Sequence, residues 1–248
     1  MSLLVRSLGV SYLDGHQIGE HLHHWGQLVY ASSGAIQVVA ERVCWLVPSA
    51  RAVWVPPRAH HQLTMRSETS LKTVYLEPGL CSDLPARCHG LEVQPLLREL
   101  IVHIVDSGYL DSSVRQQALL AELLEMLLRE AAVLPLSLRL PNDARARRAA
   151  QQIQKDPAAP LTLARLAGSV GLSVRTLQRL FLEETGMHAG EWRQTARMMA
   201  ATATLLEGAS VTDASLAAGY ATPSAFISAF QQRTGRTPLE YRLQTPLR

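Results

Sequence analysis

The chain has 248 residues, of which 47% are hydrophobic and 18% are charged, with 15 Gly and 13 Pro. This composition excludes collagen-like, low-complexity and globally disordered chains. The length allows one large domain or two ordinary domains, each large enough for its own core.

Three cysteines without a CxxC pair disfavour a disulfide framework and a cysteine zinc site. Since no apolar run approaches the roughly 20 residues that cross a bilayer, and the first residues lack a signal-peptide pattern, we expect a cytoplasmic protein with no membrane partner.

Charge and histidine are unevenly distributed. Residues 1–140 contain 11 Lys/Arg and 13 Asp/Glu, a net charge of −2, whereas residues 141–248 contain 13 and 8, a net charge of +5. Eight of the nine histidines lie in the first part. The chain therefore joins two segments of different chemistry, and the basic second segment favours a polyanionic partner.

Short extended segments dominate the first 80 residues. They include QLVYA, AIQVVA, RVCWLV, RAVWV and LKTVYLE, and Gly, Pro and Ser separate them. Runs of four to six residues rich in β-branched and aromatic side chains predict an antiparallel sandwich or barrel, not alternating β-α-β units.

Two leucine-rich helices are predicted next, at about residues 92–105 and 112–131. Ser112 and Ser113 are candidate N-caps for the second helix. A leucine stripe is usually the buried face of a helix, but a helix–helix dimer seam is the alternative. The Pro-containing segment 136–142 interrupts the pattern and is expected to be a linker.

The second half contains an internal repeat at an offset of 48 residues, which becomes 49 after one inserted residue. LARLAGSVGL (163–172) lies over VTDASLAAGY (211–220), and Glu191-Trp192-Arg193 lies over Glu240-Tyr241-Arg242. One supersecondary unit therefore occurs twice. Each copy is predicted to be two helices joined by a glycine turn, at Gly171 and Gly219. Thr162 and Thr212 are the candidate N-caps of the two first helices.

Helices joined by so short a turn cross steeply, as in a helix-turn-helix, which presents its second helix to the DNA major groove. The two units are expected at about residues 162–185 and 211–234, with a helix at 188–206 as the spacer. Arg can pair with guanine and Gln with adenine, while Ser, Thr and Ile can meet mixed edges or thymine methyls. The candidate base-reading residues are Arg175, Thr176, Gln178 and Arg179 in the first unit and Thr222, Ser224, Ile227, Ser228 and Gln231 in the second. The candidate phosphate contacts are Thr162, Thr212, Arg193, Arg236 and Arg242. The alternative is a plain helical bundle with an exposed arginine helix, which the duplication disfavours.

These residues carry a resemblance. LARLAGSVGLSVRTLQRLFLEETGMHAGEWR and VTDASLAAGYATPSAFISAFQQRTGRTPLEYR resemble the DNA-binding domain of AraC/XylS-type regulators. The sequence departs from that pattern at Ser228, where an arginine is common, and at Ser215, where Ala is usual. The resemblance implies a transcription regulator, usually an activator, that dimerises or responds to ligands through its N-terminal domain. The expected partners are double-stranded DNA, a second copy of the chain, RNA polymerase and a small-molecule effector.

A histidine motif marks the first half. His21-x-His23-x-x-x-Gln27, followed by Pro57-Arg58-Ala59-His60, resembles the two motifs of the cupin barrel, whose metal-binding members use two His, a Glu and a later His. Side chains at i and i+2 of a strand share a face, so His21 and His23 point together. By the same alternation His24 and His61 are expected at the surface. The cluster of His21, His23, Gln27 and His60 is an organic effector pocket, a divalent-metal site or a structural remnant.

The sequence therefore predicts two domains. The first, residues 1–135, is an all-β cupin-like barrel (about 1–80) followed by two helices (about 92–132), and residues 136–142 are the linker. The second, residues 143–248, is an all-α tandem helix-turn-helix domain. No catalytic residue is predicted. The alternative is a cupin-type metal-dependent enzyme with an accessory helical module, disfavoured because Gln27 replaces the carboxylate and Glu20 faces away from His21.

Overall fold

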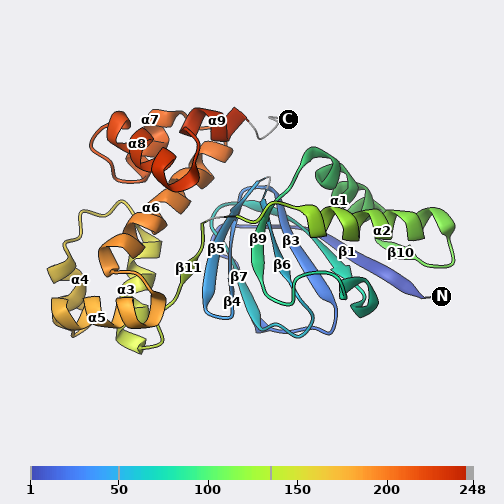
Figure 1. The fold of residues 1–248 in the computed structure, drawn as a ribbon, viewed down its shortest axis with the longest axis horizontal. Helices are drawn as coiled ribbons and strands as arrows, with labels where there is room; N and C mark the ends of the chain where they lie inside the picture. Colours follow the sequence, from blue (N-terminus) through green and yellow to red (C-terminus); the bar gives the residue numbers. More distant parts are fainter. Residues whose placement is uncertain (1, 50, 135, 244–248) are drawn as a thin grey trace. The chain divides into compact units, whose positions relative to one another are not determined.

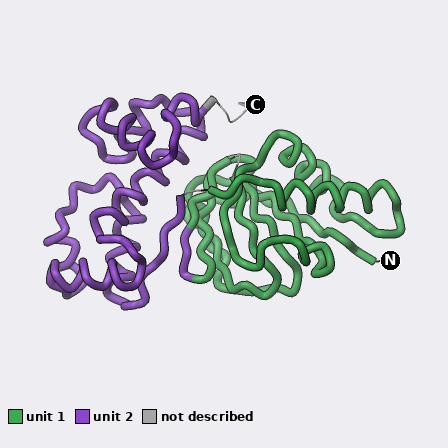
Figure 2. The backbone as a smooth tube through the Cα atoms, viewed as in Figure 1, with its two compact units in different colours: residues 1–41, 45–135 green, residues 42–44, 136–248 purple. Residues whose placement is uncertain are grey.

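The computed structural model describes residues 2–49, 51–134 and 136–243, which form two compact units (Figures 1 and 2). The first unit comprises residues 1–41 and 45–135, and the second comprises residues 42–44 and 136–248. Residue 135, the expected end of the first domain, and the last five residues lie outside the described part. None of the described helices combines the length and the apolar character needed to cross a membrane.

The N-terminal unit begins with strands and continues into two helices. Its strands are β1 (Leu3–Tyr12), β2 (Gln17–His21), β3 (Gly26–Ser33), β4 (Ala35–Ala40), β5 (Val43–Pro48), β6 (Arg51–Val55), β7 (His61–Met65), β8 (Thr69–Leu76), β9 (His89–Glu92) and β10 (Tyr109–Asp111). Its helices are the 3-10 turn η1 (Pro78–Cys81), α1 (Pro95–Ser107) and α2 (Arg115–Glu130).

The strands form two sheets within the described residues. The six-stranded sheet has the order β10-β1-β8-β3-β6-β9, and the five-stranded sheet has the order β11-β5-β4-β7-β2, where β11 is Leu138–Arg139. Neighbouring strands such as β1 and β8, β3 and β8, and β4 and β7 are antiparallel. The predicted antiparallel β-domain is therefore confirmed, but its strands are divided between two sheets and do not close into one barrel.

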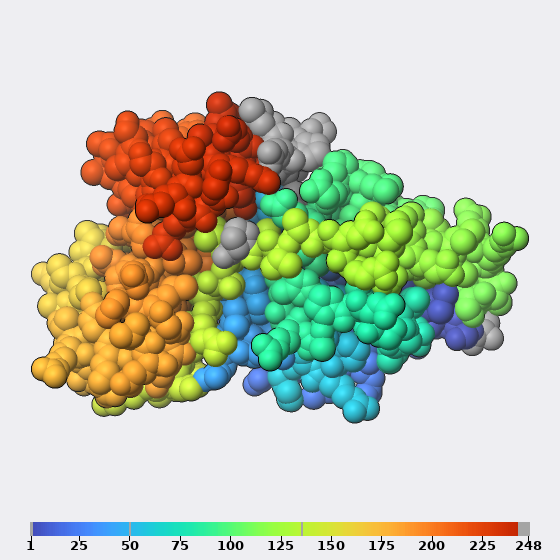
Figure 3. Space-filling model, in the orientation of Figure 1, coloured from blue at the N-terminus to red at the C-terminus, as the bar shows by residue number. Residues whose placement is uncertain are grey.

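Helices α1 and α2 cover one face of the six-stranded sheet. Leu97 and Ile101 of α1 and Leu124 of α2 are buried in one cluster with residues of β1, β3, β6 and β8. The helix α2 lies at the surface of the N-terminal unit in Figure 3. Its N-cap is Val114, not Ser112 or Ser113, because the Ser113 N–H and hydroxyl both donate to Asp111 Oδ1 at 2.8 Å and hold the preceding turn.

The C-terminal unit is helical. Its helices are α3 (Ala144–Lys155), α4 (Leu163–Ser169), α5 (Val174–Thr185), α6 (Ala189–Leu206), α7 (Val211–Ala217), α8 (Pro223–Thr234) and α9 (Pro238–Leu243). The long helix α6 contacts α3 and α5 at one end and α7 and α9 at the other, as Figure 1 shows. The predicted spacer helix at 188–206 is therefore present, and its apolar side chains Trp192, Met199, Ala203 and Leu206 are buried. The prediction of a two-domain protein with an all-α second half is confirmed.

The expected linker contains a short strand. Residues Leu138 and Arg139 of β11 pair with Cys44 and Val43 of β5. The Arg139 carbonyl also accepts a hydrogen bond from Trp192 Nε1 of α6 at 2.8 Å. Leu138 and Arg139 are therefore held by backbone pairing with residues 43–44 and by a side-chain hydrogen bond from α6, all within the second unit.

Candidate nucleic-acid interface and histidine cluster

The first helix-turn-helix unit consists of α4 and α5. The Thr162 hydroxyl accepts a hydrogen bond from Arg165 N at 3.2 Å, so the N-cap predicted for α4 is confirmed. The turn passes through Gly171, whose φ of +71° lies in the left-handed region that favours glycine. Ser173 then caps α5 by accepting a hydrogen bond from Thr176 N at 3.1 Å. Leu177 and Phe181 of α5 are fully buried, so the opposite face of α5 is the one presented to solvent.

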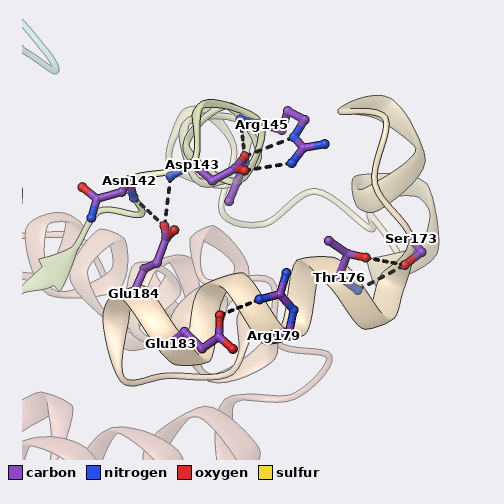
Figure 4. Close-up of polar contacts among 9 residues, drawn as sticks. Asn142, Asp143, Arg145, Ser173, Thr176, Arg179, Glu183 and Glu184 are labelled. Atoms are coloured by element: carbon purple, nitrogen blue, oxygen red, sulfur yellow. Dashed lines mark hydrogen bonds and ion pairs between the residues drawn. The ribbon is translucent and has the colours of Figure 1, made fainter.

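The exposed face of α5 carries two arginines in different electrostatic states. Arg179 Nη1 lies 2.7 Å from Glu183 Oε2 in an ion pair whose side chains are 58% and 54% exposed (Figure 4). Arg175 is exposed and makes no ion pair within the described part of the chain. Its guanidinium can therefore meet a base or phosphate without breaking an existing contact, whereas Arg179 must first leave Glu183.

Gln178 has a structural contact that the sequence analysis missed. Its Oε1 accepts a hydrogen bond from Ala189 N at 3.0 Å, which satisfies a backbone donor in the first turn of α6. Reading adenine through two hydrogen bonds requires that same oxygen. Gln178 therefore cannot make the predicted two-point contact with adenine while it caps α6.

Helix α3 is held against α5 by carboxylates (Figure 4). The Asp143 side chain caps α3 by accepting hydrogen bonds from Arg145 N and Ala146 N. Glu184 Oε2 of α5 accepts hydrogen bonds from Asn142 N at 2.6 Å and Asp143 N at 3.0 Å. The Arg145 side chain bound to Asp143 holds the pKa of that carboxyl well below its ordinary value. The cap is thus charged at neutral pH.

The second unit consists of α7 and α8, and its first cap differs from the prediction. Ser210, not Thr212, is the N-cap of α7, and it forms a reciprocal capping box with Asp213. The 48-residue offset of the repeat places Thr162 over Ser210, so the sequence contained the signal for this assignment. Thr212 is exposed in the first turn, and its carbonyl accepts a hydrogen bond from the Ser215 hydroxyl at 2.8 Å. This bond satisfies the buried hydroxyl at Ser215.

The outward face of α8 is uncharged and mostly polar. Thr222 caps the helix by accepting a hydrogen bond from Ala225 N at 3.3 Å, and Pro223 follows at its first position. Phe226 and Phe230 are fully buried on the other side. The predicted reading residues of α8 are all exposed: Thr222, Ser224, Ile227, Ser228 and Gln231.

The two units share a set of buried aromatic contacts. The rings of Phe181 and Trp192 are 5.7 Å apart at 83°, and those of Phe230 and Tyr241, at matching repeat positions, are 5.4 Å apart at 85°. Such edge-to-face pairs add to the stability gained from buried area. The sequence repeat is therefore also a repeat of the packing.

Two predicted phosphate contacts are also engaged within the fold. Arg193 donates to the Leu161 carbonyl, and Arg242 donates to the Ala209 carbonyl at 3.2 Å. Each accepting residue directly precedes the N-cap of its unit's first helix. Both arginines therefore hold the start of a helix-turn-helix, whereas the third candidate, Arg236, is exposed.

Three histidines meet in the N-terminal unit, where β2 and β7 pair. His21 ends β2 and is the register partner of His61, which begins β7, and their ring centroids are 4.2 Å apart. The His23 ring lies 5.0 Å from that of His61 and 6.0 Å from that of His21. One ring nitrogen of each of the three lies within 4.8 Å of the others. The cluster therefore combines the two predicted histidines of the first motif with His61.

His60 is not part of this cluster. Its side chain is 65% exposed and its Nδ1 lies 4.0 Å from Glu20 Oε1, whereas His61 is 1% exposed. The prediction that His60 faces inward and His61 outward is wrong because the residues before His61 form a turn. Ala59 N donates to Pro56 O at 3.2 Å, and β7 begins only at His61. Strand alternation therefore cannot be counted across this segment.

Gln27, the fourth predicted residue, is buried beside the cluster. Its Oε1 lies 2.9 Å from His23 Nε2, and its amide nitrogen donates to Thr73 Oγ1 at 2.8 Å and to the Tyr75 hydroxyl at 3.1 Å. Burial, together with smaller contributions from the neighbouring histidines, lowers the pKa of His61 to about 4. The His61 ring is therefore neutral at neutral pH.

Comparison with known proteins identifies the class. The model of the AraC-like ligand binding domain matches residues 8–153, and that of a helix-turn-helix domain matches residues 166–244. The chain is 30% identical over 224 residues to the HTH-type transcriptional regulator NimR of Escherichia coli (strain K12), covering 89% of this chain and 81% of that protein. It is 27% identical to the arabinose operon regulatory protein of Salmonella typhimurium (strain LT2), covering 98% and 82%. Among solved structures, ToxT from Vibrio cholerae O395 aligns over 97% of this chain and 98% of that chain, with a TM-score of 0.41 and 12% identity.

The fold and the comparisons together define a DNA-binding transcription regulator with an N-terminal ligand-binding domain. The chain belongs to the AraC family of HTH-type transcriptional regulators.

Proposed function

We propose that this regulator is a cytoplasmic activator that binds double-stranded DNA as a homodimer, with α5 and α8 in successive major grooves. Grooves on one side of a duplex recur about every 34 Å. The observation that carries the proposal is the duplicated packing: Phe181 with Trp192 and Phe230 with Tyr241 position the two recognition helices in the same way. The effector-bound N-terminal domain then favours the DNA-binding dimer and its contact with RNA polymerase.

The two units contribute unequally in this proposal. Arg175 and Arg179 give α5 two charged groups for guanine or phosphate, whereas the outward face of α8 offers the hydroxyls of Ser224 and Ser228 and the amide of Gln231, all uncharged. We therefore assign most of the base discrimination to α5. The helix α8 adds backbone affinity and reads DNA shape.

The dimer is assigned to the leucine-rich helices. Leu96 of α1 is 58% exposed, and Leu119 and Met126 of α2 are 54% and 38% exposed. Leu119 and Met126 are seven residues apart and so share a helix face. Apolar side chains on one face support a helix–helix seam between two copies of the chain.

The proposal includes no catalytic activity. The fourth position of the histidine motif is the neutral amide of Gln27, and its side chain is already bound to Thr73 and Tyr75. The relatives that match over most of the chain are named as regulators.

Selection of random-sequence duplexes by the full-length protein, at about 0.15 M salt, tests the proposal. The expected result is one enriched motif in which each copy of the chain accounts for two elements about 10 base pairs apart. A variant with Arg175 and Arg179 both replaced by Ala is the matched control and should lose the enrichment. Absence of any enriched motif with the unmodified protein would overturn the proposal.

A further inference from the structure

The three clustered histidines share one hydrogen-bond arrangement at their Nδ1 atoms. His21 Nδ1 lies 2.8 Å from Gly19 O, His23 Nδ1 lies 2.5 Å from Trp25 O, and His61 Nδ1 lies 3.0 Å from Ala59 O. A carbonyl oxygen only accepts hydrogen bonds, so each Nδ1 carries a proton. In the neutral rings every Nε2 is then left with an unshared electron pair.

His61 supplies a second, independent sign of a ligand. The residue is 1% exposed, and within the described part of the chain its Nε2 has no hydrogen-bond partner. Buried polar atoms in folded proteins almost always have a partner. The unshared electron pair of His61 Nε2 is buried beside two other imidazoles and has no hydrogen-bond donor within the described residues. This arrangement indicates that a cation or another electron-pair acceptor occupies that position.

His23 is also poorly satisfied at Nε2. Its contact there is Gln27 Oε1 at 2.9 Å. With the proton on Nδ1, both atoms of this contact are acceptors, so Gln27 does not bind the neutral ring. The Gln27 amide is held instead by Thr73 and Tyr75. The His23 ring can therefore turn its Nε2 away from Gln27 without losing a favourable hydrogen bond.

We propose that His21, His23 and His61 form a binding site for one divalent first-row transition-metal ion, such as Zn²⁺, with one ring nitrogen of each histidine as a ligand. Imidazole suits Zn²⁺, Ni²⁺, Cu²⁺ and Fe²⁺. Histidines that bind metal usually donate their second ring N–H to a carbonyl or carboxylate, which is the arrangement of all three rings here.

The geometry requires only a small closure. Zn–N bonds of about 2.0–2.1 Å place tetrahedral ligand nitrogens about 3.3 Å apart, and the three ring nitrogens already lie within 4.8 Å of one another. His61 is fixed in the core, whereas His21 and His23 are only half-buried and can move toward it. With no carboxylate among the three ligands, the fourth position takes water or an anion.

Titration calorimetry with ZnCl₂ on the full-length protein, without DNA and with any affinity tag removed, tests the site. The expected result is one equivalent of Zn²⁺ per chain, and His21→Ala or His23→Ala should weaken binding by more than about 100-fold, since even the loss of an outer-shell partner costs 10–100-fold. His24→Ala and His60→Ala are matched controls: both residues are exposed histidines beside the cluster, and their replacement should leave the affinity unchanged. CoCl₂ provides a spectroscopic readout, since three nitrogen ligands in a tetrahedral site give intense visible absorption.

Lack of saturable Zn²⁺ binding by the unmodified protein would overturn the metal site. Equal loss in His60→Ala and His21→Ala would overturn the assignment of the ligands. Because His21 and His23 are half-buried, their variants are expected to fold, and circular dichroism verifies this. Selection on DNA is measured separately, so failure of the metal site leaves the proposed DNA-binding function untouched.

Discussion

The two arginines on α5 differ in their ion pairing, and this difference predicts how much each contributes to DNA affinity. Replacement of an arginine that binds guanine through two hydrogen bonds costs about 1–3 kcal/mol, which is about 5- to 140-fold in Kd. Arg175 makes no ion pair within the described residues, so Arg175→Ala should show this full loss.

Arg179 should behave differently because it binds Glu183 before it binds DNA. An exposed ion pair of this kind is worth about 0.2–1 kcal/mol, and DNA binding must break it. Arg179→Ala should therefore weaken binding less than Arg175→Ala does. Conversely, Glu183→Gln releases Arg179 and should strengthen binding by roughly 1.4- to 5-fold.

Fluorescence anisotropy on the selected site, at one fixed salt concentration, measures all three variants. Glu68→Gln, at an exposed glutamate between β7 and β8 of the N-terminal unit, is the control for the change in net charge. If Glu183→Gln weakened binding, or if Arg175→Ala left Kd within twofold of the unmodified protein, the assignment of these two roles would be refuted.

Three further predictions concern contacts that hold the helical unit. Arg193→Ala should lower the free energy of unfolding by about 0.5–1.5 kcal/mol, because it removes the hydrogen bond to the Leu161 carbonyl. The same variant should leave the salt dependence of DNA binding unchanged. Loss of a phosphate contact would instead reduce the slope of log K against log salt concentration by about 1. Gln178→Ala should lower the melting temperature by removing the cap on Ala189 N, worth about 0.5–1.5 kcal/mol, as calorimetry can measure. Asp143→Ala should cost about 0.5–2 kcal/mol at neutral pH. The pKa of Asp143 is lower in the folded state, so the contribution of its carboxylate to the free energy of unfolding is present above pH 3.8 and is lost as the pH falls further. Chemical denaturation in acid should therefore show a smaller difference in the free energy of unfolding between Asp143→Ala and the unmodified protein.

The sequence predicted those features that depend on periodicity. Buried positions such as Phe226 and Phe230 recur at helical spacing, and the glycine turns at Gly171 and Gly219 have the positive φ that their position requires. Two-domain organisation follows from the same patterns. The closure of the β-domain could not be predicted, because hydrogen bonding between distant strands leaves no periodic signal in the chain.

The errors arose where a local rule was extended past its limits. The alternation that excluded His61 was counted through the turn at Pro56–Ala59, where strand geometry does not hold. The contact from Gln178 to Ala189 crosses between two helices, so no spacing rule indicates it. Thr212 was a different kind of error, since the offset of the repeat itself pointed to Ser210.

In the duplicated unit, the residues that stabilise each helix-turn-helix are different from the residues that face DNA. Buried aromatic pairs at matching positions hold both copies, whereas the exposed position of Arg179 in the first copy is Ser228 in the second. An exposed substitution of this kind changes stability by only about 0.5 kcal/mol, but it removes a charge and a two-point hydrogen-bond donor from the reading face. Two copies with the same fold can therefore differ strongly in base recognition. The repeated sequence motif is enough to identify each copy as a helix-turn-helix. The contribution of each copy to base specificity depends on its exposed side chains.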